Sequence, residues 1–426
     1  MESIRMPGID EVIYYDVCDN GLPVYMWVND RVNNFYATLN VKYGSMDTEF
    51  KFNEKDDYIK VSDGIAHFLE HVKFNESDDT TAHDYYQNIG ASINAFTTFN
   101  FTSYEVFAST EFNKCLTHLL DYVQKPYFTD ALTEKEKGII CEEVKMGKNN
   151  PGHKLYYGMN NALYFEDKRR IYVTGDVDDV KGITTEELQL VFDTFYHPKN
   201  MFMVITGNFN PDEAIALVKE NQAKKDFIEY RNPIVKKSHE KNGVIKDYIE
   251  IEGNIEIPKV KMAYKMNREI FGDIDPMLLN VYLSVILRNN FGSTSLLREE
   301  LMEKELVTSF GAVREMLNDV ITIEINIETK YPTEVIGIVK EKLKDLNITK
   351  EEIRRRCKAN VASLINDYDD IEYVNSDICE QLVLYDKFYD DMYEMYDGLK
   401  LKEAKDVINM LDFSNSTIAV LIPYKE

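Results

Sequence analysis

The stretch "TSYEVFASTEFNKCLTHLLDYV" at residues 102–123 decides the fold, because its hydrophobic pattern changes period in the middle. Residues 102–109 alternate apolar and polar side chains, which predicts a strand, and residues 111–123 space them three and four apart, which predicts a helix. The same order recurs at residues 320–330 ("VITIEINIETK") and 332–346 ("PTEVIGIVKEKLKDL"). A pattern that recurs in this way indicates an internal repeat.

The repeat continues through a second pair of predicted helices, "LTEKEKGIICEEVKM" and "ITKEEIRRRCKANVASLI". Each opens with a threonine that a glutamate follows three residues later, at Thr133 and Glu136 in the first half and at Thr349 and Glu352 in the second. This spacing is typical of a capping box at the start of a helix.

Each half then closes on an apolar strand, "NMFMVITGN" at residues 200–208 and "STIAVLIP" at residues 416–423. Strands followed by helices, without strict alternation, predict an α+β fold. We therefore expect two homologous domains, each a mostly antiparallel sheet with helices packed on it.

A polar stretch at residues 223–248, "AKKDFIEYRNPIVKKSHEKNGVIKDY", separates the halves. A chain of 426 residues is long enough for two domains. We place a first domain at residues 1–228, a linker at 229–246 and a second domain at 247–426.

Composition excludes several classes of protein. The formal charge of -25 argues against nucleic acid as a partner, since phosphate binding needs a basic surface. Residues 1–17 show no basic start followed by an apolar run, and no apolar run is long enough to span a membrane, so we expect neither secretion nor membrane spanning and a cytoplasmic protein. Its five widely spaced cysteines predict buried thiols in a reducing compartment and argue against a cysteine-built zinc site.

The chemistry is carried by "GIAHFLEHVKF" at residues 64–74. On a helix, His67, Glu70 and His71 project from one face. Two imidazoles one turn apart suit zinc, which would leave Glu70 as a general base. The alternative is an ordinary amphipathic helix whose polar face is solvated, and a third ligand has to distinguish the two.

Helical geometry singles out a third ligand in "EKEKGIICEEVKM". Glu143 falls two turns after Glu136 on nearly the same bearing, between Ile139 and Ile140, whereas Glu142 points away. A carboxylate on an apolar stripe is costly to bury unless it is paired or bound to metal. Glu143 is therefore the candidate ligand, and Glu136 either orients a histidine or caps the helix.

The second half lacks this constellation. All seven histidines lie at or before His239. Aligning Thr133 with Thr349 shifts the numbering by 216 and places Ala359 opposite Glu143. The basic run at residues 354–356 is expected to be a solvent-exposed face.

Taken together, "HFLEH", "IGASINAFTTFNFTSYEVFA", "EKGIICEEVKM" and "TGDVDDVKGITTEEL" resemble the insulinase or pitrilysin family of zinc metallopeptidases. The chain is most similar to the short-chain branch that contains mitochondrial processing peptidase and its bacterial relatives. The resemblance implies a zinc-dependent endopeptidase acting on short or unfolded peptides, with one zinc ion per chain.

The same resemblance implies a role for each site residue. Zinc would be held by His67, His71 and the second glutamate of an ExxxxxxE pair, which falls on Glu143 after Glu136. Glu70 would be the base. The segment "INAFT" resembles the family's edge strand that pairs with substrate backbone, which implicates Asn94 and Ala95.

One departure concerns an arginine and a tyrosine, seven residues apart, that complete members carry in the second half. Here Met302 and Ser309 stand at those positions, and Arg298 is followed seven residues later by Glu305. We therefore expect a heterodimer in which a homologous subunit supplies the missing pair. The alternative is a non-catalytic scaffold subunit, and the sequence leaves homodimerisation of the isolated chain open.

Overall fold

The computed structural model describes residues 1–424, and these fold into two compact units. Unit 1 comprises residues 1–145, 171–236 and 364–392. Unit 2 comprises residues 146–170, 237–363 and 393–426, of which the last two lie outside the described residues. Each unit is built on its own main sheet.

The main sheet of unit 1 has seven strands in the order β1-β2-β3-β9-β4-β8-β7. Its strands are β1 (Glu2–Met6), β2 (Glu11–Val17), β3 (Pro23–Val28), β4 (Phe35–Val41), β7 (Ser92–Thr97), β8 (Thr102–Ala108) and β9 (Met201–Gly207). A small second sheet contains β5 (Glu49–Lys51), β6 (Ile59–Lys60) and β10 (Ile234–Val235). The helices are α1 (Ile65–Lys73), α2 (Ala82–Asn88), α3 (Phe112–Gln124), α4 (Asp130–Asn149), α6 (Val177–Gly182), α7 (Thr185–Phe195), η2 (Pro198–Asn200), α8 (Pro211–Ala223) and α13 (Ile371–Tyr385).

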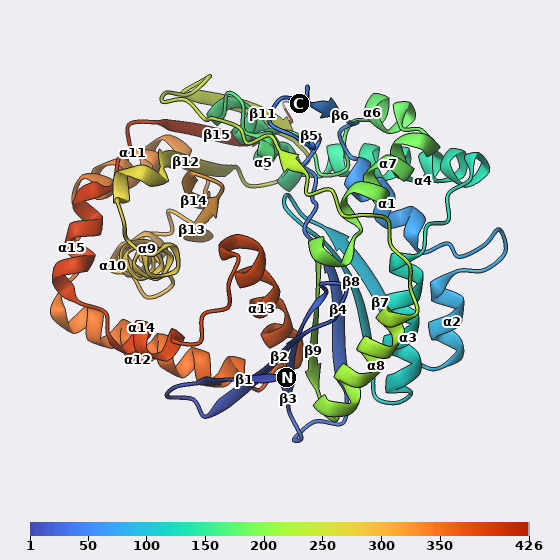
Figure 1. Ribbon diagram of the computed structural model, residues 1–426. Helices are drawn as coiled ribbons and strands as arrows, with labels where there is room; N and C mark the ends of the chain where they lie inside the picture. The colour runs from blue at the N-terminus through green and yellow to red at the C-terminus, as the bar shows by residue number, and fades with distance from the viewer. Residues whose placement is uncertain (425–426) are drawn as a thin grey trace. The chain divides into compact units, whose positions relative to one another are not determined.

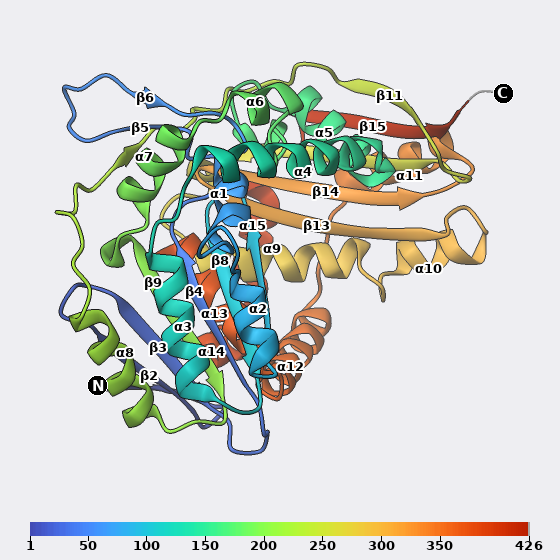
Figure 2. The same cartoon turned by 90° about the vertical axis from the view of Figure 1, so that its right-hand side faces the viewer.

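The sheet of unit 2 has five strands in the order β11-β15-β12-β14-β13. They are β11 (Tyr248–Gly253), β12 (Lys259–Asn267), β13 (Ser309–Leu317), β14 (Val320–Glu328) and β15 (Ser416–Pro423). The helices are α5 (Pro151–Leu163), η1 (Lys168–Arg170), η3 (Arg268–Phe271), α9 (Pro276–Phe291), α10 (Leu296–Glu303), α11 (Pro332–Lys344), α12 (Lys350–Asp367), α14 (Met392–Asp397) and α15 (Leu401–Met410). Figure 2 shows α9 running beside β13.

Strand order confirms the internal repeat. The run β3-β9-β4-β8-β7 of unit 1 corresponds, position by position, to β11-β15-β12-β14-β13 of unit 2. In both runs the first two strands are parallel and the other pairs are antiparallel. The α+β fold of two homologous, mostly antiparallel domains is therefore confirmed.

Helices cover both faces of the unit 1 sheet. Figure 1 shows α3 and α8 on one side of β4 and β9, and α13 on the other. Every residue of β4 and β9 is buried, as expected for central strands that are covered on both faces. All five cysteines are buried free thiols, as predicted. Within residues 1–424, no helix is both long and apolar enough to cross a membrane.

The two units are not contiguous in sequence, and in this they differ from the expected halves. Helix α13 belongs to unit 1 because it carries Asn375, which is fully buried against β4 and β9. The Asn375 side chain accepts a hydrogen bond from Thr38 Oγ1 (2.8 Å) and donates one to the Val204 carbonyl (3.1 Å). Thr206 Oγ1 donates to the Ile371 carbonyl (2.7 Å). The domain limits 1–228, 229–246 and 247–426 stay a prediction.

A glycine fixes the start of α1. Gly64 has φ +84°, a left-handed conformation that non-glycine residues adopt at a cost. A Cβ atom at this position would lie 2.3 Å from the Thr174 carbonyl oxygen. Only glycine therefore lets the backbone at Thr174 pass this close to the first turn of α1.

We expect Gly64→Ala to lower the free energy of unfolding by about 3 kcal/mol, because it adds both backbone strain and a clash with fixed backbone atoms. The thermal midpoint should fall by about 6 °C or more. Gly138→Ala is the matched control, since Gly138 is exposed within α4 and a Cβ there meets nothing within 4 Å. The control should leave the midpoint unchanged or raise it. Equal midpoints for the two variants would contradict the proposed constraint.

Candidate metal centre

Helix α1 is buried almost all the way round. Eight of its nine residues are buried, including His67 and Glu70, which are 9% and 7% exposed. The interpretation of this helix as an amphipathic element with a solvated polar face is therefore wrong. Polar side chains that lose water need partners within the protein.

Helix α4 supplies those partners. Nε2 of His67 lies 3.6 Å from Oε1 of Glu143, and Nε2 of His71 lies 3.4 Å from Oε2 of Glu143. One ligand atom from each of the three residues lies within 4.8 Å of the others, and the described residues contain one such group. Tetrahedral zinc with bonds of about 2.0 Å holds its ligand atoms about 3.3 Å apart. The donor set and its spacing therefore fit zinc.

The electrostatics of the group also favour a cation. Hydrogen bonds from His67 and His71 hold the pKa of Glu143 well below its usual range. Burial acts to lower the pKa of His71, but hydrogen bonds to Glu136 and Glu143 outweigh it and raise this pKa to about 9. Without a metal, the carboxylates therefore retain a proton on His71. A bound metal ion would take the place of that proton.

Glu136 lies beside the group and does not cap its helix. Helix α4 begins at Asp130, so Thr133 and Glu136 lie inside it, and the predicted capping box at this position is wrong. The predicted box at Thr349 and Glu352 is confirmed, with both reciprocal hydrogen bonds present. Glu136 is buried, and its Oε2 lies 3.7 Å from Nδ1 of His71. It is thus placed to orient the imidazole.

The prediction for Glu143 assumes that Ile139 and Ile140 on either side of it are buried, and this holds for only one of them. Ile140 is fully buried, but Ile139 is 49% exposed and the Glu143 side chain is 42% exposed. Glu143 therefore lies at the edge of the buried face, where a carboxylate can reach both imidazoles without being fully desolvated.

Glu70 has a partner that the sequence did not reveal. Thr97, the last residue of β7, donates a hydrogen bond from Oγ1 to Oε2 of Glu70 (2.7 Å). The only signal was its position in "INAFT", and nothing there distinguishes it from any other threonine in a strand.

The strand β7 is an edge strand, as the resemblance implied. It pairs with β8 alone and ends the order of the sheet, so its outer backbone groups have no strand partner among the described residues. Asn94 and Ala95 lie in the middle of it, opposite Glu105 and Tyr104. An edge of this kind can accept an extended peptide as an additional strand.

In unit 2, Met302 lies on α10 and Ser309 begins β13, and both are exposed. Arg298, also on α10, donates a hydrogen bond to the Ser293 carbonyl (3.2 Å). No second cluster of metal-ligating side chains occurs in this unit within the described residues.

A repeated α+β fold with two histidines and a glutamate gathered from facing helices defines a class of zinc-dependent peptidases. The family model "Insulinase (Peptidase family M16)" matches residues 37–169, and "Peptidase M16 inactive domain" matches residues 182–360. The chain belongs to the M16 (insulinase) family.

Two relatives and a solved structure support this assignment. The "Uncharacterized zinc protease YmfH" of Bacillus subtilis is 31% identical over 419 residues, 96% of each chain. Mitochondrial-processing peptidase subunit beta of Dictyostelium discoideum is 23% identical over 345 residues, covering 76% of this chain and 71% of the relative. The crystal structure of an M16-like peptidase from Alicyclobacillus acidocaldarius matches with a TM-score of 0.89 and 27% identity, over 97% of this chain and 98% of that one.

We expect Glu136→Gln to weaken zinc binding about 10- to 100-fold, because it removes the carboxylate that faces Nδ1 of His71. The measurement is competition for zinc against a chromophoric chelator. Glu142→Gln is the control, since Glu142 is exposed on the same helix and pairs with Lys145. Equal zinc affinities for both variants would contradict an orienting role for Glu136.

Proposed function

We propose that this chain is the zinc-bearing subunit of an endopeptidase that cleaves short or unfolded peptides. The observation that carries the proposal is the convergence of His67, His71 and Glu143 at the spacing of tetrahedral zinc ligands. We assign one zinc ion per chain to these three residues. Such an ion lowers the pKa of a bound water towards neutrality and polarises a carbonyl.

In this proposal Glu70 is the general base. Its side chain is buried beside the two histidines on α1, and Oε2 accepts the hydroxyl of Thr97. That hydrogen bond fixes the orientation of the carboxylate and leaves Oε1 to take the proton from the attacking water. The same group can then return the proton to the leaving amine.

The substrate class follows from β7. An edge strand reads the main chain of a peptide by backbone hydrogen bonds, and only an extended segment can pair with it over several residues. Asn94 and Ala95 would contact the segment next to the scissile bond. Folded proteins offer few such segments, which favours short or unfolded peptides as substrates. A cytoplasmic location stays a prediction.

We expect Glu70→Gln to retain roughly stoichiometric zinc and to lose peptide cleavage, because the amide cannot take up the proton. Metal content and hydrolysis of a quenched fluorescent peptide, measured on the same preparation, test this prediction. His71→Ala is the comparison variant, and it should lose both zinc and activity. An unchanged rate in Glu70→Gln would remove Glu70 as the base. A wild-type chain that binds zinc but never cleaves, even with a homologous subunit that carries the arginine and tyrosine, would favour the scaffold alternative.

The partner is the second part of the proposal. Met302 and Ser309 cannot supply the charge and the phenol that complete family members use to hold substrate and stabilise the transition state. We propose that a homologous chain provides the arginine and tyrosine.

The isolated chain should therefore hydrolyse peptides slowly, and a homologous subunit that carries the arginine and tyrosine should raise the rate by about 100-fold or more. The test is a titration of one purified chain with the other, read by peptide cleavage and by light scattering. The control is a partner with its arginine replaced by glutamine, which should assemble without restoring the rate. Rapid cleavage by the purified chain alone would contradict the need for a partner.

A further inference from the structure

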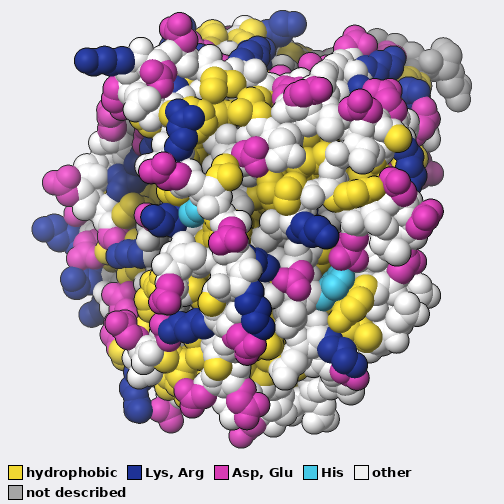
Figure 3. Space-filling model, turned by 45° about the vertical axis from the view of Figure 1, so that its right-hand side comes forward, with side chains coloured by type: hydrophobic (Ala, Val, Ile, Leu, Met, Phe, Trp, Pro, Cys, Tyr) yellow, Lys and Arg dark blue, Asp and Glu magenta, His cyan; other side chains and the backbone are white. Residues whose placement is uncertain are grey.

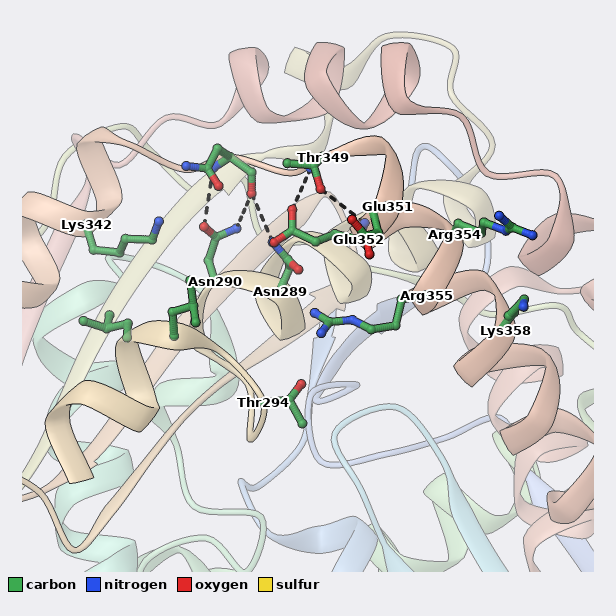
Figure 4. A pocket seen from close by; sticks show the side chains of 13 residues that line it. Asn289, Asn290, Thr294, Lys342, Thr349, Glu351, Glu352, Arg354, Arg355 and Lys358 are labelled. Atoms are coloured by element: carbon green, nitrogen blue, oxygen red, sulfur yellow. Dashed lines mark hydrogen bonds between the residues drawn. The ribbon is translucent and has the colours of Figure 1, made fainter. Parts of the chain in front are cut away.

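Unit 2 contains a cavity of about 650 Å³ that the proposed peptidase site does not use. It lies at the ends of α9 and α11 and along the first turns of α12 (Figure 4). Four basic side chains line it, from Lys342, Arg354, Arg355 and Lys358. In Figure 4 the Arg355 guanidinium extends towards Asn289 and Thr294.

The cavity keeps an excess of positive charge, since four basic side chains face two glutamates, Glu351 and Glu352, in its lining. No ion pair joins Arg354, Arg355 or Lys358 to a carboxylate in the part of the chain that the structure describes. Of the two glutamates in the lining, Glu352 accepts the Thr349 backbone N–H (2.7 Å) and offsets part of the charge of Arg355. On the face drawn in Figure 3, by contrast, acidic and basic side chains are intermixed.

The pKa of the neighbouring Arg356 reflects the same excess of positive charge. Burial, together with the guanidinium groups of Arg355 and Arg288, lowers the pKa of Arg356. Its Nη2 donates hydrogen bonds to the Arg288 carbonyl (2.7 Å) and to Thr294 Oγ1 (3.2 Å), which hold it behind the lining residue Arg355. An anion in the cavity would relieve this repulsion.

Two buried asparagines supply the polar lining. Asn289 and Asn290 are 8% and 3% exposed, and both side-chain amides donate to the Asn347 carbonyl, at 3.3 Å and 3.0 Å. These bonds fix the amide of Asn289, whose Oδ1 is buried and has no hydrogen-bond partner among the described residues. The two amides therefore give this end of the cavity a polar wall.

The internal repeat relates the helices at the cavity to the helices of the metal centre. Helices α9 and α12 of unit 2 occupy the places in the repeat that α1 and α4, the helices of the metal centre, occupy in unit 1. Residues 133–143 of α4 contain two more acidic than basic residues, whereas residues 349–359 contain three more basic than acidic residues. The second unit has therefore reversed the charge of the helix that carries Glu143 in the first.

We propose that this cavity binds a small organic phosphate that carries hydroxyl groups. The planar fork of Arg355 matches the oxygens of a phosphate group, and lysines at the rim add point charges. The volume exceeds that of inorganic phosphate and is typical of sites for small organic molecules. The amide and hydroxyl groups of the lining, among them Asn290 and Thr294, are polar partners for ligand hydroxyl groups. The proposal does not depend on the peptidase activity of unit 1.

Isothermal titration of the full zinc-loaded chain with fructose 1,6-bisphosphate tests the proposal, since a sugar bisphosphate offers both phosphate and hydroxyl groups. We expect saturable binding of one molecule per chain at 0.15 M salt, where diffuse surface attraction is screened. Arg355→Gln should weaken binding about tenfold or more, through the loss of a charge-assisted hydrogen bond. Lys350→Gln should bind within about twofold of the wild type, because Lys350 begins the same helix outside the cavity lining.

Three results would overturn the proposal. The first is the absence of saturable heat at millimolar bisphosphate, and the second is equal weakening in Arg355→Gln and Lys350→Gln, which would indicate attraction to the surface in general. The third is saturable binding of a glutamate-rich peptide in place of the bisphosphate, which would assign the cavity to acidic peptide. Fructose itself is the uncharged control and should not bind. Because Arg355 is exposed, its substitution should leave the thermal midpoint unchanged.

Discussion

The constraint on which unit 1 depends is the burial of a helix that carries polar side chains. Helix α1 packs into the core with Ile65, Phe68 and Leu69 fully buried, and this packing carries His67 and Glu70 into the interior with them. An unpaired buried carboxylate or imidazole costs several kcal/mol. The fold therefore has to bring α4 and the end of β7 against the polar side of α1. The site results from the need to give the buried polar side chains of α1 hydrogen-bond or metal partners.

Spacing alone was enough to predict part of this site. His67, Glu70 and His71 are one helical turn apart, so a local pattern determines their common face, and Glu143 followed from a helical bearing combined with a family pattern. The role of Glu136 could not be decided in the same way. Its spacing from Thr133 matches a capping box, and only the start of α4 three residues earlier excludes that role. Thr97 could not be found at all, because a hydroxyl that meets a carboxylate across a fold leaves no periodic signal.

Some features of the fold also follow from local sequence patterns, and others depend on contacts between distant residues. Alternation and helical periodicity gave the paired elements of the two halves, and the matched strand orders follow from them. Helix α5 lies in the first half of the sequence but belongs to unit 2, and α13 lies in the second half but belongs to unit 1. The sequence did not predict this, since each is an ordinary helix whose partner sheet is determined by tertiary contacts. In α13 the buried amide of Asn375 satisfies groups on β4 and β9 at once, and buried apolar residues such as Val374 and Ile378 pack beside it. A single asparagine in a helix carries no information about which sheet it will meet.

The two units have the same strand order and opposite chemistry on equivalent helices. In unit 1, carboxylates on α4 face imidazoles on α1, and the group attracts a cation. In unit 2, α12 presents arginines beside amides at the end of α9, and the group attracts an anion. A repeated backbone can carry either site, because the sheet and its helices are stabilised by apolar faces that both units retain, while the polar positions of these helices are free to change. The absence of the metal ligands from unit 2 therefore need not destabilise its fold, and other positions on the equivalent helices line the cavity.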